Sequence, residues 1–369
     1  MQLSLFLLNL VGQCCFTTCL LYEYRYINDK MTWSVAQQYC RNKYTDLATV
    51  SNMTDMKRLL YKSTMMQGGE AWIGLYKDVT WTWHWSLPGV EFNNSETNWE
   101  KNEGSVTGTE NCGFINKRFN LGDDPCETKK HFFLCFNESN PSQKIHLISE
   151  NKTWWEAQRY CRENHTDLVS GVDQLQHEKL KSLVTSSNGN VFFIGLFRDS
   201  WRWSDGSSFS FRQWSVSITD PQSQTTDQCA VMVKDSERWN SRSCNEEKPF
   251  FCYDDKVILI RQQMNWENAL YYCREHHRDL VTITNLDEQR WVQEKAKNAT
   301  TPYVWTGLRY TCTLDFWFWV SNQAVTYKNW ASGQDGNDCD MSGAMETGGE
   351  HKWFKINDNN KMNFICSKS

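Results

Sequence analysis

The sequence predicts an α+β protein built from three tandem copies of one disulfide-linked unit, preceded by a secretory leader. Three observations predict this class. A set of motifs containing tryptophan and cysteine occurs three times in the same order, the 369 residues include 15 Cys and 19 Trp, and the first residues are apolar. Because 369 residues is too long for one ordinary domain, a repeated unit is the simplest organisation.

The composition excludes several classes of protein. Apolar residues make up 40% and charged residues 22% of the chain, which is enough to bury hydrophobic cores. A net charge of -5 argues against non-specific nucleic-acid binding, which needs a basic surface. The sequence has no H-E-x-x-H, G-x-S-x-G or P-loop motif, so we expect no enzyme.

Residues 1–20 are predicted to form a signal peptide. The apolar run from Leu3 to Val11 is too short to span a bilayer and lies where a secretory leader has its apolar region. We expect cleavage near Cys19 or Leu20. The alternative is a buried first strand.

The remaining cysteines indicate an oxidising compartment. Removal of the leader leaves twelve cysteines, an even number, with no C-x-x-C pair of the kind that binds zinc. No later stretch approaches the roughly 20 apolar residues of a membrane helix. We therefore expect a secreted protein or a cell-surface ectodomain whose anchor lies outside this sequence. Six glycosylation sequons support this, at Asn52, Asn93, Asn137, Asn151, Asn164 and Asn298.

The first repeated motif predicts an amphipathic helix. T-W-S-V-A-Q-Q-Y-C-R at residues 32–41 recurs in related form at 153–162 and 265–274. In each copy Trp, Ala and Cys lie at positions i, i+3 and i+7, on one face of a helix. These residues are Trp33, Ala36, Cys40; Trp154, Ala157, Cys161; and Trp266, Ala269, Cys273. We also expect a strand before each helix, as at residues 257–260, and a second helix after it, as at 286–297.

The remaining motifs predict strands. Each copy continues with Asp-Leu, a Gly-Leu strand, a Trp-x-Trp pair, a lone Trp and a hydrophobic segment ending in Cys. We interpret these tryptophans as core residues rather than sugar platforms, because the repeats place them on structural strands. The Gly-Leu motifs are at residues 72–75, 193–196 and 305–308, and the Trp-x-Trp pairs at 83–85, 201–203 and 317–319. The lone tryptophans are Trp99, Trp214 and Trp330, and the last cysteines are Cys135, Cys252 and Cys366.

In this order, the motifs resemble the C-type lectin-like domain family over essentially the whole mature chain. The tandem arrangement looks like a short relative of the macrophage mannose receptor group. The resemblance implies two helices, small antiparallel sheets and long loops in each copy, with domains at residues 21–136, 143–253 and 255–368. It also implies binding of glycans, glycoproteins or protein ligands, in innate recognition or endocytic clearance.

The resemblance implies the disulfide pairing. The helix cysteine is expected to pair with the last cysteine of its copy, and a second bridge to span the upper loop. In the third copy the fourth cysteine should fall at Asp358 and is absent, so we expect the extra Cys312 to pair with Cys339; the alternative is two free thiols. The other expected bridges are Cys40–Cys135, Cys161–Cys252, Cys273–Cys366, Cys112–Cys126 and Cys229–Cys244.

Calcium is the one cofactor that the resemblance implies. Calcium takes about 6–8 oxygen ligands. In this family most come from a Glu-Pro-Asn or Gln-Pro-Asp triplet, an acid before the loop cysteine, and a Trp-Asn-Asp segment. The first copy keeps Glu103, Glu110 and Asp123 but has lost both amides and the proline. We expect weak calcium binding at most.

The other two copies depart further from the family pattern. The second copy keeps Asp220, Asp227 and Asn240, and the third carries Lys355 where a ligand belongs. We therefore expect the calcium-dependent sugar sites to be degraded and recognition to be calcium-independent. The alternatives are a functional calcium-dependent lectin with avidity across three weak sites, or an endocytic receptor ectodomain that lacks its membrane anchor here.

Overall fold

The structure, a computed structural model, describes residues 21–66, 68–101, 103–104, 110–140, 142–215, 227–336 and 339–368. The expected signal peptide lies outside the described residues. The described residues form two compact units, one over residues 24–252 and the other over residues 253–368 together with residues 21–23. Each unit combines helices and strands, so the predicted α+β class is confirmed.

The C-terminal unit holds one complete copy of the repeat. Its sheet has the order β13-β19-β15-β17-β18, with α7 packed beside it through Trp266, Ala269 and Cys273. After its Gly-Leu motif the chain turns back, and Leu308 of β15 pairs with Trp319 of β16. The elements are β13 (Val257–Met264), α7 (Trp266–His276), β14 (Asp279–Leu280), α8 (Leu286–Ala296), β15 (Tyr303–Thr311), β16 (Phe316–Trp319), β17 (Met341–Glu346), β18 (Trp353–Asn357) and β19 (Met362–Ser367).

The N-terminal unit holds the first two copies. The predicted helix faces are confirmed in both, because Trp33, Ala36 and Cys40 are buried on one helix and the equivalent residues on the other. The first copy contributes β1 (Tyr22–Met31), α2 (Trp33–Lys43), β2 (Asp46–Leu47), α3 (Met53–Ser63), β3 (Glu70–Trp85), β4 (Cys112–Asn116), β5 (Leu121–Asp124) and β6 (His131–Phe136). The second contributes β7 (Ile145–Lys152), α4 (Trp154–Asn164), β8 (Asp167–Leu168), α5 (Val172–Leu175), α6 (Glu178–Ser186), β9 (Val191–Trp203), β10 (Gln228–Val233), β11 (Arg238–Ser243) and β12 (Lys248–Asp255).

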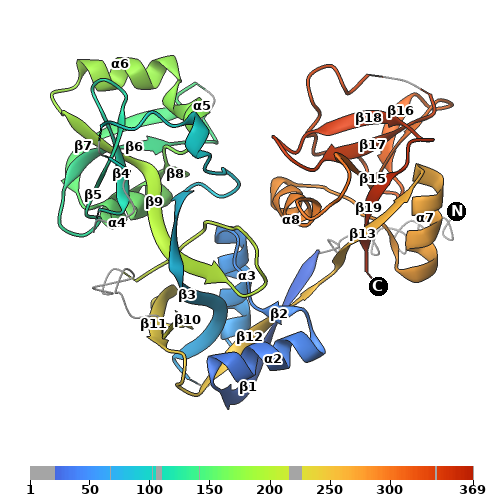
Figure 1. Ribbon diagram of the computed structural model, residues 1–369, viewed down its shortest axis with the longest axis horizontal. Helices are drawn as coiled ribbons and strands as arrows, with labels where there is room; N and C mark the ends of the chain where they lie inside the picture. The colour runs from blue at the N-terminus through green and yellow to red at the C-terminus, as the bar shows by residue number, and fades with distance from the viewer. Residues whose placement is uncertain are drawn as a thin grey trace, which may run out of the picture. The chain divides into compact units, whose positions relative to one another are not determined.

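The first two copies exchange halves through strands β3 and β9. Neither strand turns back after its Gly-Leu motif; each runs on through its Trp-x-Trp pair as one long strand, as Figure 1 shows. The two strands pair antiparallel, with Leu75 opposite Trp203 and Trp85 opposite Leu196. This is the Leu–Trp pairing of the third copy, but here it joins residues of different copies.

The exchange produces two lobes. The first lobe combines residues 24–77 with residues 200–252, and the second lobe consists of residues 82–199. In the first lobe, Trp33 and Trp72 share a core with Phe250. The cores are therefore complete, although each is assembled from two copies.

Hydrogen bonds also join residues of the two different copies. The hydroxyl of Ser204 donates to Asp46 at 2.7 Å, and that of Ser86 donates to Asp167 at 2.7 Å. Each serine follows the Trp-x-Trp pair of one copy, and each aspartate belongs to the Asp-Leu motif of the other. The third copy has Val320 at this position, in an unexchanged arrangement.

Two expected disulfides are therefore wrong. The structure joins Cys40 to Cys252 and Cys135 to Cys161, in place of Cys40–Cys135 and Cys161–Cys252. Each helix cysteine still pairs with the last cysteine of a repeat. Because of the exchange, the last cysteine in the same lobe belongs to the other copy. The remaining bridges among the described residues have the expected pairing: Cys112–Cys126, Cys229–Cys244, Cys273–Cys366 and Cys312–Cys339.

The length of one connection accounts for the exchange. The leucine of the Gly-Leu motif and the last tryptophan of the Trp-x-Trp pair are ten residues apart in the first copy, seven in the second and eleven in the third. In the second copy, a hairpin in the register of β15 and β16 would leave only Asp199 and Ser200 for the turn. Two-residue hairpin turns need residues that tolerate positive φ, typically Asn-Gly or a leading Gly. Short, strained connections of this kind favour exchange of strands.

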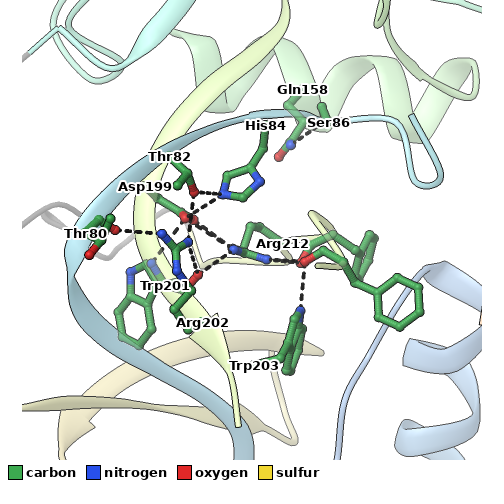
Figure 2. A network of polar contacts seen from close by, with 12 residues as sticks. Thr80, Thr82, His84, Ser86, Gln158, Asp199, Trp201, Arg202, Trp203 and Arg212 are labelled. Atoms are coloured by element: carbon green, nitrogen blue, oxygen red, sulfur yellow. Dashed lines mark hydrogen bonds and ion pairs between the residues drawn. The ribbon is translucent and has the colours of Figure 1, made fainter. Parts of the chain in front are cut away.

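A buried polar network holds the crossing strands together (Figure 2). Arg212 donates to Asp199 through Nε at 2.7 Å and Nη2 at 3.2 Å, and its side chain is 1% exposed. Burial alone raises the pKa of Asp199, but the charge of Arg212 and contact with His84 hold it well below its usual range. His84 comes from β3 and lies 3.5 Å from Asp199 of β9. Between the same strands, Arg202 donates to the hydroxyl of Thr82 at 2.9 Å. The network therefore connects the two copies at their crossing point.

Lengthening the short connection should restore the unexchanged pairing. We expect insertion of three residues containing glycine between Asp199 and Ser200 to shift the disulfides toward Cys40–Cys135 and Cys161–Cys252, because a relaxed hairpin can then close. Peptide mapping under non-reducing conditions measures the pairing. The same insertion after Ser187, in an exposed turn, is the control and should leave Cys40 linked to Cys252. Within-copy bridges in the wild-type protein would contradict the exchange.

Removing one charge from the network should destabilise the N-terminal unit. Asp199→Asn leaves the guanidinium of Arg212 buried without a counter-charge, so we expect a loss of about 3–5 kcal/mol in the free energy of unfolding. Urea denaturation measures this. Glu178→Gln is the control, since Glu178 pairs with Lys181 at the surface, where ion pairs contribute about 0–1 kcal/mol. Equal unfolding midpoints for the two variants would contradict the prediction.

Candidate functional site

Two of the three carboxylates expected in the first copy lie together. The backbone N–H of Asp123 donates to Oε2 of Glu103 at 3.2 Å, and the N–H of Gly104 donates to Oδ1 of Asp123 at 2.7 Å. Burial, together with the adjacent Glu103, raises the pKa of Asp123 to about 6. At neutral pH this is a pair of like charges, which a proton or a cation would relieve.

A cationic side chain of the second copy already lies beside this pair. Arg198, which is buried on β9, donates from Nη2 to the backbone carbonyl of Glu110 at 3.1 Å and from Nε to Oδ1 of Asn111 at 2.9 Å. Burial lowers the pKa of Arg198, and the charge of Asp123 opposes that shift. The strand exchange thus brings a fixed positive charge to the loop where the family would hold an ion.

The donor set of this loop does not fit calcium. Calcium needs about 6–8 oxygen ligands, whereas among the described residues the carboxylate of Glu103 accepts the backbone N–H of Asp123, and Glu110 is exposed beside Arg198. Across the residues that the structure describes, no group of three or more His, Cys, Asp or Glu side chains is placed to hold a metal ion. We therefore derive no function through a bound metal here.

The expected ligands of the second copy are also not assembled. Asp220 lies outside the described residues. Asp227 accepts hydrogen bonds from the hydroxyl of Ser243 at 2.9 Å and from the amide of Asn245 at 3.0 Å, so its carboxylate is engaged within the loop. Asn240 lies on β11, and its buried Oδ1 has no partner among the described residues.

In the third copy an ion pair takes the place of the upper-loop disulfide. Arg309 donates to Asp358 at 2.6 Å, and Asp358 occupies the position of the missing cysteine, as counting along the sequence predicts. Ser342 of β17 lies opposite Arg309 of β15. The equivalent pair in the first lobe is Cys229 of β10 opposite Tyr76 of β3. Sequence reasoning missed Arg309, because its role depends on the register of β15 and β17. Nearby, the ammonium of Lys355 lies against Gly336.

Most of the repeated tryptophans belong to the core, as predicted, whereas Trp83, Trp99, Trp317 and Trp330 are only partly buried. Trp72, Trp85, Trp201, Trp305 and Trp319 are all buried. The first tryptophan of each Trp-x-Trp pair packs on the lone tryptophan of the same copy, with ring centroids 4.7–5.0 Å apart: Trp83 on Trp99, Trp201 on Trp214, and Trp317 on Trp330.

The sequons differ in their exposure. Asn52 is 5% exposed, and its side chain accepts the backbone N–H of Asp55 at the start of α3, so it is a poor position for a glycan. Asn137 is half-buried. The exposed sequons are Asn93, Asn151, Asn164 and Asn298. No helix in the described part of the chain is both long and apolar enough to cross a membrane.

Curated relatives are multi-domain receptors. The chain is 23% identical over 402 residues to C-type mannose receptor 2 of Homo sapiens, covering 92% of this chain and 26% of the receptor. It is 22% identical over 372 residues to the secretory phospholipase A2 receptor of Pongo abelii, covering 82% of this chain and 24% of the receptor. The chain therefore spans about a quarter of the length of these relatives.

Solved structures match single copies. The C-type lectin CEL-I from Cucumaria echinata is 20% identical with a TM-score of 0.28, and covers 31% of this chain and 89% of its own. The carbohydrate-recognition domain of the mouse scavenger receptor C-type lectin is 24% identical with a TM-score of 0.28, covering 31% and 87%. The family described as the lectin C-type domain matches residues 29–136, 150–254 and 262–368. Because these three matches account for most of the sequence, the chain belongs to the C-type lectin domain family.

Proposed function

We propose that this chain is a recognition protein that binds glycans or protein ligands through its C-type lectin-like domains without a resident calcium ion. The observation that carries the proposal is the anchoring of Arg198 to Glu110 and Asn111, in the loop of the copy that retains three acidic positions. A fixed guanidinium already supplies positive charge there and disfavours a second cation. We propose no catalytic step for the chain.

An extracellular location supports this function. The six disulfides of the described residues need an oxidising compartment, and four of the sequons lie at exposed positions where a glycan can be accommodated. We propose secretion or display on a cell surface. The receptor names of the curated relatives favour display, with a membrane anchor supplied outside this sequence.

One observation favours a calcium-dependent lectin as the second candidate. Asp123 lies beside Glu103, and a bound cation would lower the raised pKa of Asp123. The two candidates differ in what calcium does to this pair.

The Asp123→Asn variant separates the two candidates. The pKa of Asp123 is about 6 in the folded state and about 3.9 in an unfolded chain, so its ionised form destabilises the fold above about pH 6. This cost fades as the pH falls toward 4. We therefore expect Asp123→Asn to have a higher Tm than the wild type at pH 7.5 and an equal Tm near pH 4.

Excess calcium at pH 7.5 should leave both Tm values unchanged. Asp227→Asn, at an exposed loop position, is the matched control and should not change the Tm at either pH. If calcium raises the Tm of the wild type but not that of Asp123→Asn, the calcium-dependent candidate is correct.

A glycan array in calcium and again in EDTA tests the proposed function directly. We expect any glycan retained by the secreted chain to be retained equally in EDTA, because no ion contributes to the contact. The double variant Glu103→Gln/Asp123→Asn should behave like the wild type. Loss of retention in EDTA, together with loss in the double variant, would overturn the calcium-independent proposal.

A further inference from the structure

A pocket of about 460 Å³ lies within the N-terminal unit, between α3 of the first lobe and α4 of the second lobe. Its size is in the range of small-molecule sites, about 300–1,000 Å³. Met53, Met56 and Leu60 of α3 form an apolar wall, and Trp155 and Arg159 of α4 lie on the other side. Residues 213–215 and 236–238 complete it, so both lobes contribute to one pocket.

The pocket is lined by four basic side chains, Lys57, Arg159, Arg162 and Arg238, and by four glutamates, Glu127, Glu156, Glu163 and Glu237. Arg162 is engaged by Asp167 at 3.0 Å and is held in place. Arg159 makes no hydrogen bond or ion pair with the described residues. Arg159, Arg162 and Arg238 line the same pocket. Burial lowers the pKa of Arg238, the charges of Arg159 and Arg162 lower it further, and the charge of Glu163 opposes the shift. The carboxylate nearest to Arg238 is Glu163, at 3.8 Å and largely exposed.

Of the other three glutamates in the lining, two accept hydrogen bonds from other groups and one is exposed at the rim. Glu156 accepts the backbone N–H of Thr153 at 2.9 Å, as part of the capping box of α4. Glu127 accepts the indole N–H of Trp155 at 3.3 Å. Glu237 is exposed at the rim. An anion from solution can therefore contact Arg159, which has no ion pair with the described residues, and Arg238, whose ion pair with the exposed Glu163 is long.

The rest of the lining suits a sugar ring. Trp155 and Trp214 supply aromatic surface, and the buried indole N–H of Trp214 has no acceptor within the described residues. Gln213, Ser215 and Ser236 supply neutral polar groups that can bond to hydroxyls. Guanidinium groups bind carboxylates and sulfates through paired N–H donors.

We propose that this pocket binds an acidic sugar, a pyranose ring whose sulfate or carboxylate group contacts Arg159 and Arg238, without calcium. The inference rests on the proposed function for its general ligand class and names a site distinct from the acidic loop of the first copy. Sulfated and carboxylated sugars share the required chemistry, a ring with a compact oxyanion.

Calorimetric titration of the full chain with galactose 6-sulfate, glucuronic acid and galactose tests the proposal. We expect one or both acidic sugars to bind equally in calcium and in EDTA, and galactose to bind at least tenfold more weakly. Arg159→Ala should weaken the acidic sugar at least tenfold, and Arg159→Lys should restore part of the loss. Arg118→Ala removes an exposed positive charge from the same unit and is the matched control. Non-reducing peptide mapping checks that each variant keeps the Cys40–Cys252 bridge.

Three outcomes would overturn the proposal: equal weakening by Arg118→Ala, inorganic sulfate binding as tightly as galactose 6-sulfate, or an O-sulfotyrosine peptide binding more tightly than either sugar. The last would assign the pocket to a protein ligand. Failure of the proposed function is distinguishable, because it would appear as EDTA-sensitive retention on the array. Absence of acidic-sugar binding with EDTA-insensitive retention of other glycans would refute this site alone.

Discussion

The antiparallel pairing of β3 with β9 is the contact on which the N-terminal unit depends. Once the connection between Leu196 and Trp203 is too short for a relaxed hairpin, the chain continues straight, and every later element lies in the other lobe. Little intrinsic stability is lost, because each lobe regains the same strand pairings and the same kind of core from equivalent motifs. The loop entropy of joining two halves of one chain grows only slowly with length.

The Asp199–Arg212 pair favours the exchanged arrangement over the closed one more than it contributes to the free energy of folding. Desolvation of two charges consumes most of the attraction between them, but a lone buried charge is strongly unfavourable. Asp199 lies on β9, and His84 reaches it from β3. A closed second copy would place Asp199 in a turn and separate these groups. The short connection between Leu196 and Trp203 therefore disfavours the closed form, and the contacts of Asp199 with Arg212 and His84 favour the exchanged one.

The helices and strands within each copy could be predicted from the sequence, whereas it could not be predicted which copy completes each lobe. The helix face of Trp33, Ala36 and Cys40 follows from spacing within ten residues. Cys135 and Cys252 end equivalent strands, so nothing in the motifs tells Cys40 which to join. The same limit applies to the candidate site. The resemblance identified the acidic loop of the first copy, but the guanidinium beside it arrives from the second copy through the exchange.

Fixed guanidinium groups change what controls recognition. A bound calcium ion dissociates when calcium is scarce or when its carboxylates take up protons, so a lectin that uses it is gated by both. Guanidinium groups carry their charge throughout the physiological pH range. Their attraction for an oxyanion is screened by salt, over about 8 Å at physiological ionic strength. A chain that replaces the ion with arginines should therefore retain an acidic ligand where calcium is depleted and release it as ionic strength rises.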